Sequence, residues 1–167
     1  MSARIGFARE SARKLIKNTG QSTIPIDLQK ICEELGFQYV EIATFPPGLS
    51  ALCVEQEGVK YAVVNKGHHS PRKRFSLAHE LGHWIFGHTR SFPQSEVTID
   101  HPPNPEDVKR NNKEEEAEAN EFAGELLVPL SLLKESLKKT QDIAQLASMY
   151  DVSKEVMTIR RMSTHTL

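Results

Sequence analysis

The sequence has no long apolar run, no excess of one charge and no cluster of cysteines. No stretch approaches the roughly 18 apolar residues that a membrane-spanning helix requires, and the N-terminal segment builds no apolar core of a secretory signal. The 21 basic and 22 acidic side chains leave a formal net charge of −1, so the chain has no global attraction to nucleic acid or anionic membranes. These absences predict a cytoplasmic protein that does not act at a membrane, and direct DNA binding is not expected.

The two cysteines, Cys32 and Cys53, form no C-x-x-C pair. In a reducing compartment such residues are typically buried free thiols, with a disulfide or a cysteine metal ligand as the alternatives. At 167 residues, with 38% apolar and 26% charged side chains, the chain has the size and composition of one globular domain. We therefore treat residues 1–167 as a single domain.

The hydrophobic periodicity predicts an α+β fold. Helices are expected at 3–18, 26–35, 72–86, 113–127, 130–139, 141–149 and 153–162, and strands at 37–43, 49–55 and 59–65. The simplest arrangement is a small antiparallel sheet within residues 1–70 and a C-terminal helical bundle over 130–163. Residues 87–112 are rich in proline, and a loop of that length is usually functional, so we interpret it as a rim or lid beside the site.

The most informative motif is His79-Glu80-Leu81-Gly82-His83, within the helix predicted over 72–86. Histidines at positions i and i+4 share one helix face, so both imidazoles can reach one metal ion, and neutral imidazole suits Zn²⁺. Glu80 can face water at the metal, which is the position of a general base in metal-assisted hydrolysis. The motif predicts one zinc ion per chain, against the alternative of two surface histidines beside an incidental glutamate.

A catalytic zinc site typically has three protein ligands, so a third residue is needed. A histidine six residues after His83 would complete one common pattern, but Thr89 occupies that position and His88 is displaced by one. We therefore interpret His88 as a residue at the rim of the site or a helix cap.

The acidic helix predicted over 113–127 offers better candidates for the third ligand. Glu115 and Glu116 border its apolar stripe, and periodicity favours Glu116 only modestly. Asn120 shares the edge of Glu116 and could orient a histidine ligand through its other ring nitrogen. The remaining glutamates are expected on a solvated back or flank of the helix: Glu114, Glu118, Glu121 and Glu125.

Several segments resemble the ImmA/IrrE family of metallopeptidases: 74–83, 116–123, 126–129, 61–65, 146–153 and Arg160. In that family and in thermolysin-like zincins, the third ligand is a glutamate followed four residues later by asparagine or aspartate. The resemblance therefore implies a zincin-like metalloprotease fold, with Glu116 as the third ligand and Asn120 as its supporting partner.

A mechanism follows from zinc on His79, His83 and Glu116. Glu80 would take a proton from the attacking water and deliver it to the leaving amine of a peptide bond. The edge of the 49–65 hairpin could bind the substrate backbone by strand addition. A further donor is needed for the oxyanion, and the candidates are His88, Tyr61, His68, His69 and His101.

The expected substrate class follows from the resemblance alone. It implies a zinc metallo-endopeptidase that cleaves or inactivates an Xre-type helix-turn-helix repressor, as a regulatory protease or antirepressor. One alternative is a zinc-containing module that binds a partner without proteolysis, in a sensor or toxin–antitoxin-like pair. Another is DNA binding through residues 141–162, where Ser153 is a good N-cap for a helix–turn–helix; Glu155 and the absence of net positive charge weigh against it.

Overall fold

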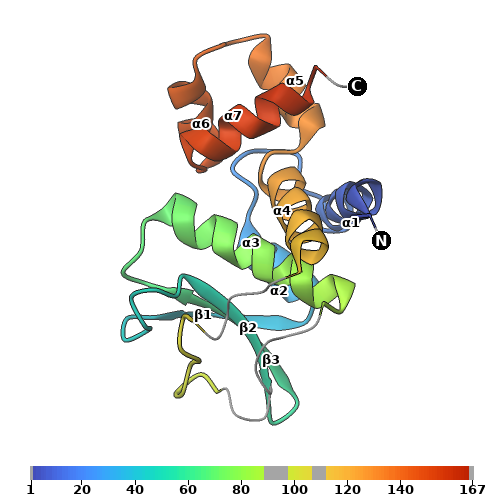
Figure 1. Ribbon diagram of the computed structural model, residues 1–167. Helices are drawn as coiled ribbons and strands as arrows, with labels where there is room; N and C mark the ends of the chain where they lie inside the picture. Colours follow the sequence, from blue (N-terminus) through green and yellow to red (C-terminus); the bar gives the residue numbers. More distant parts are fainter. Residues whose placement is uncertain (1, 89–97, 107–111, 166–167) are drawn as a thin grey trace.

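The computed structural model describes residues 2–88, 98–106 and 112–165, which form seven helices and three strands within these ranges (Figure 1). The helices are α1 (Ile5–Asn18), α2 (Leu28–Glu34), α3 (Ser70–Phe86), α4 (Lys113–Leu127), α5 (Leu130–Leu137), α6 (Ile143–Tyr150) and α7 (Lys154–Ser163). The strands are β1 (Phe37–Ile42), β2 (Ala51–Gln56) and β3 (Val59–Asn65). This mixture confirms the predicted α+β class, and α4 covers the residues predicted for it.

The sheet is mixed, with the strand order β1-β3-β2. β2 and β3 form the predicted antiparallel hairpin, and both residues of its turn, Glu57 and Gly58, have positive φ angles of 52° and 77°. β1 instead runs parallel to β3. This corrects the expectation of an entirely antiparallel sheet. After β1 the chain crosses to the opposite edge of the sheet, where it forms β2, and β3 then lies between β1 and β2.

Helix α3 lies between the sheet and helix α4, whereas α2 packs against β1 (Figure 1). Helix α3 packs on β2 and β3 on one side and on α4 on the other, and α1 packs on α4. The α3–α4 contact is close at Gly82, where a Cβ atom would lie 3.0 Å from Cδ1 of Phe122 and 3.3 Å from Cα of Ala119. A glycine at this position therefore sets the spacing of the two helices.

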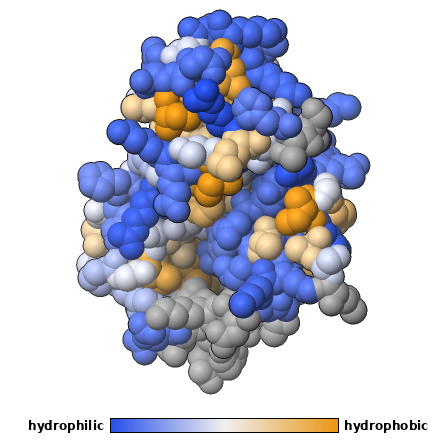
Figure 2. Space-filling view, turned by 45° about the horizontal axis from the view of Figure 1, so that its top comes forward, coloured by the Kyte–Doolittle hydropathy of each residue, from blue (hydrophilic) through white to orange (hydrophobic). Residues whose placement is uncertain are grey.

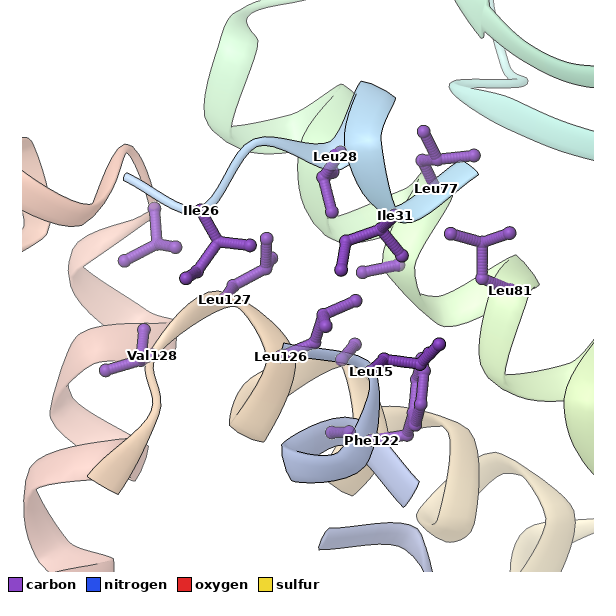
Figure 3. Close-up of a cluster of buried hydrophobic side chains, with 14 of the residues drawn as sticks. Leu15, Ile26, Leu28, Ile31, Leu77, Leu81, Phe122, Leu126, Leu127 and Val128 are labelled. Atoms are coloured by element: carbon purple, nitrogen blue, oxygen red, sulfur yellow. The ribbon is translucent and has the colours of Figure 1, made fainter. Parts of the chain in front are cut away.

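The main core lies between the sheet and helices α1 to α4 and continues into α5, α6 and α7. Figure 3 shows its side chains pointing toward one another, including Leu15, Ile31, Leu77, Leu81, Phe122 and Leu126. Alternation along β3 places Ala62 and Val64 in this core, on the α3 side of the sheet. Tyr61 and Val63 belong to a second cluster, with Leu52 and Val54, on the opposite side.

The charged face of α4 is largely buried, which overturns the expectation of a solvated face. Glu118 is 5% exposed and Glu125 is 1% exposed. Arginines of the N-terminal segment pair with these side chains: Arg4 with Glu118 at 2.8 Å, Arg9 with Glu121 at 2.6 Å and Arg13 with Glu125 at 2.9 Å. The helical periodicity of α4 by itself could not predict that its glutamates are buried, because the opposite charges come from the N-terminal segment and α1.

The C-terminal helices are held by polar contacts, of which those of Arg160 are buried. Ser153 caps α7 as predicted, and its Oγ accepts from the Val156 amide at 3.1 Å. Asp151, in the turn before α7, accepts from Ser70 Oγ at 2.5 Å. Arg160 is 3% exposed and donates to the carboxylates of Glu121 and Glu125. The Arg160 guanidinium therefore faces the interior.

The surface shown in Figure 2 is mainly hydrophilic, with apolar residues in separate patches. Large apolar side chains exposed in the described ranges are Phe7, Ile159 and Met162. Within residues 2–88, 98–106 and 112–165, no helix combines the length and apolar character needed to cross a bilayer.

Both cysteines are buried thiols outside any disulfide, as predicted. Burial raises the pKa of the Cys32 thiol to about 12, with smaller contributions from Asp27 and Glu33. We therefore expect neither thiol to react with a disulfide reagent in the folded protein at mildly alkaline pH, and both to react after denaturation in guanidinium. Rapid modification of either thiol in the native state would contradict these positions.

Replacing Arg160 with Met should lower the free energy of unfolding by about 3 kcal/mol, because Glu125 stays buried with fewer partners. Arg161→Met is the matched control, since its hydrogen bonds to Gln141 are exposed; its effect should remain below about 1 kcal/mol. Denaturant unfolding of the metal-free proteins measures both values. Equal effects of the two substitutions would show that the buried network does not stabilise the fold.

Candidate metal centre

Three side chains from α3 and α4 converge at one point. Nε2 of His83 lies 2.9 Å from Oε1 of Glu116, and Nε2 of His79 lies 3.2 Å from Oε2 of the same carboxylate. The two Nε2 atoms are 2.9 Å apart. These separations are close to the roughly 3.4 Å between ligand atoms around a tetrahedral zinc ion. The structure thus brings together the three residues predicted as metal ligands.

The hydrogen bonds on the other ring nitrogens fit this arrangement. Nδ1 of His79 lies 2.9 Å from Oδ1 of Asn120, an acceptor, so this ring carries its proton on Nδ1. Nδ1 of His83 lies 2.8 Å from Nδ1 of His88, and Nε2 of His83 faces His79 and Glu116. Lone pairs on two nitrogens and a carboxylate then face one another, and a cation such as Zn²⁺ fits that donor set. Asn120 occupies the orienting position that was predicted for it.

Glu80 and His79 lie on a cleft of about 540 Å³ beside this cluster. Its other walls come from Phe75 and Ser76 of α3 and from Asn120 of α4. The chain at 48–51, which leads into β2, forms the opposite wall together with Pro105 and Glu106. Glu80 therefore lines the same cavity as His79, where a bound molecule could reach it.

His88 does not lie on this cleft, contrary to the expectation of an oxyanion or substrate contact. It is 9% exposed, and Nε2 lies 3.1 Å from Oε2 of Glu118. Hydrogen bonds from Arg4 are the main cause that lowers the pKa of Glu118 to about 2. The ring points inward because Gly87, with φ 65°, reverses the chain at the end of α3. Sequence spacing could not reveal this reversal.

Tyr61 is also separated from the cleft. It belongs to the second apolar cluster, on the face of the sheet away from α3, so the expectation of a catalytic contact is corrected. His68 is held by Ser50 Oγ at 2.8 Å and by the Pro47 carbonyl at 2.9 Å. His69 is the residue that precedes α3, and His101 contacts Thr98.

The predicted rim loop, 87–112, is described in part. Pro105 and Glu106 line the cleft, as expected for a rim. Residues 89–97 and 107–111 lie outside the described residues, so closure of the loop over the site stays a prediction.

The fold and the converging side chains define a metallopeptidase-like α+β domain. Residues 32–162 match the Peptidase_M78 family model, described as the IrrE N-terminal-like domain. The chain therefore belongs to this family, as the resemblance predicted. Membership indicates a function of the metallopeptidase or regulatory type.

Comparisons with individual proteins show that the fold also occurs in a solved structure. A search of curated proteins found no match. A solved structure described as a Mycobacterium tuberculosis transcriptional regulator aligns over 93% of this chain with a TM-score of 0.66 and 19% identity. This chain spans 46% of the length of that protein, and the likeness shows a common fold.

Substituting Ala for Glu116 should weaken zinc binding more than about 100-fold, because it would remove one of three ligands. Glu115→Ala is the matched control, since its side chain is not among the three that converge. Competition with a chelating dye, together with elemental analysis, measures the affinity and stoichiometry. Loss of zinc in the Glu115 variant with retention in the Glu116 variant would overturn the ligand assignment.

Proposed function

We propose that this protein is a zinc-dependent endopeptidase that cleaves or inactivates an Xre-type helix-turn-helix repressor and so acts as an antirepressor. The observation that supports it most is the convergence of His79, His83 and Glu116, with His79 and Glu80 lining one cleft. Family membership supports the reaction class. The similar solved protein is described as a transcriptional regulator, which supports a role in transcription. Such a substrate would place the protein in the cytoplasm.

The residues of the cleft suggest how hydrolysis would proceed. Zinc held by the three side chains would polarise a peptide carbonyl and make a water molecule more acidic. Glu80 accepts the proton of the attacking water and passes it to the leaving amine. Asn120 keeps the proton of His79 on Nδ1, so that Nε2 remains available as a ligand.

The outer strand of the sheet beside the cleft suggests how the substrate backbone binds. β2 is an outer strand of the sheet, paired with β3 on one side, and it packs along α3. The chain leading into β2, at 48–51, lines the cleft. An extended peptide added to this edge would lie over His79 and Glu80, with its backbone held by hydrogen bonds. This mode suits a protein substrate.

Two alternatives are kept because specific features favour them. A zinc site can serve partner binding without proteolysis, and ligand geometry by itself does not exclude that use. DNA binding by α6 and α7 is favoured by their helix–turn–helix arrangement. Burial of Arg160 weighs against it, because that guanidinium is committed to Glu121 and Glu125.

Glu80→Gln should abolish cleavage of the Xre-type repressor encoded nearest the gene, while zinc binding is retained, because the amide cannot accept the proton. The zinc-loaded proteins would be incubated with the repressor and the products identified by mass spectrometry. Glu57→Gln, in the exposed hairpin turn, is the matched control and should cleave normally.

The outcomes separate the candidate functions. A discrete cut that depends on Glu80 supports the endopeptidase. Tight repressor binding with zinc but no cut in any variant would favour the partner-binding module. Salt-sensitive binding of duplex DNA by the protein alone would favour the DNA-binding alternative.

A further inference from the structure

A buried hydrogen-bonded chain extends from His83 away from the cleft. The residue that accepts from His83 is His88, which follows the left-handed Gly87 at the end of α3. The backbone amide of His88 donates to the His83 carbonyl at 3.0 Å, so the chain turns back on the helix. This turn places the two imidazole rings edge to face, with centroids 4.9 Å apart.

The proton positions along this chain follow from its two ends. When Nε2 of His83 is a metal ligand beside Glu116, the proton of the ring is on Nδ1 and is donated to Nδ1 of His88 over 2.8 Å. His88 must then carry its own proton on Nε2, which lies 3.1 Å from Oε2 of Glu118. A carboxylate can only accept this proton. One direction of donation, from His83 through His88 to Glu118, therefore satisfies every atom.

Glu118 is a fixed acceptor because Arg4 holds both of its oxygens. The Arg4 amide and Nε donate to Oε1 at 2.8 and 3.1 Å, and Nη2 donates to Oε2 at 2.8 Å. The carboxylate is thereby held at the end of α1. His83 thus has an anion behind it through an intervening imidazole, whereas His79 has the neutral amide of Asn120.

We infer that His88 and Glu118 form a positioning relay that holds the ring and the proton of His83 in the state required of a metal ligand. The inference rests on the proposed metal site at His79, His83 and Glu116. Partners behind a ligand histidine fix its tautomer and ring orientation, and their loss typically weakens metal binding 10- to 100-fold. His88 is therefore assigned to supporting the metal ligand, not to contacting substrate.

The relay can be tested by comparing the zinc affinities of His88 variants, measured by competition with a chelating dye at a single pH. His88→Leu fills similar space but can neither accept from His83 nor donate to Glu118, and should weaken binding 10- to 100-fold. His88→Gln can do both with its amide and should recover most of the affinity. His165→Leu, at an exposed position, is the control and should bind like the unmodified protein. Unchanged affinity in His88→Leu would overturn the relay.

A second measurement does not need the metal. Because Glu118 accepts from Nε2 of His88, long-range ¹H–¹⁵N spectra of the metal-free protein should show His88 protonated on Nε2 and His83 protonated on Nδ1. In His88→Leu the His83 proton should move to Nε2, which faces the Glu116 carboxylate. The opposite tautomers in the unmodified protein would overturn the relay. These spectra also reveal whether His88→Leu remains folded. If the expected tautomers occur but the unmodified protein binds no zinc, the proposed metal site fails, and with it the relay's role.

Discussion

The close packing of α3 against α4 is the contact on which the site depends. Gly82 has no side chain, so Phe122 and Ala119 of α4 approach the backbone of α3 directly. Glu116, on the same helix, then reaches the Nε2 atoms of both histidines. A larger residue at position 82 would push the helices apart, and ligand atoms separated by about 3 Å leave little tolerance for such a shift.

Most of the buried negative charge of α4 is paired with arginines from neighbouring segments of the chain. Arg4, Arg9 and Arg13 neutralise the glutamates that face α1, and Arg160 of α7 adds a second partner to two of them. Glu116 instead turns toward His79 and His83. One helix thus carries glutamates that stabilise the fold through arginine and one glutamate suited to a cation.

Some residues that support the site lie outside the segment that matches the family model. The match to the IrrE N-terminal-like domain spans residues 32–162, which includes β1 to β3, α3 and α4. Helix α1 lies before it, yet Arg4 and Arg13 hold buried carboxylates of α4. The N-terminal helix therefore contributes to the surroundings of the site, and the cleft beside β2 is formed by residues within the match.

The sequence by itself determined the features that depend on local periodicity. Spacing of i and i+4 placed His79 and His83 on one helix face, and the apolar stripe of α4 reduced the choice of ligand to Glu115 or Glu116. The element boundaries agree to about two residues for the same reason. The hairpin turn and the cap at Ser153 also arise from neighbouring residues.

Only the tertiary structure decided which surfaces meet. The parallel pairing of β1, the inward turn of His88 and the placement of Tyr61 away from the cleft each depend on contacts between distant segments. Glu118 and Glu125 look solvated on a projected helix, but they are buried because α1 and α7 bring arginines to them. A helical pattern specifies which residues share a face, whereas the element that packs against that face decides whether a charge is solvated or paired.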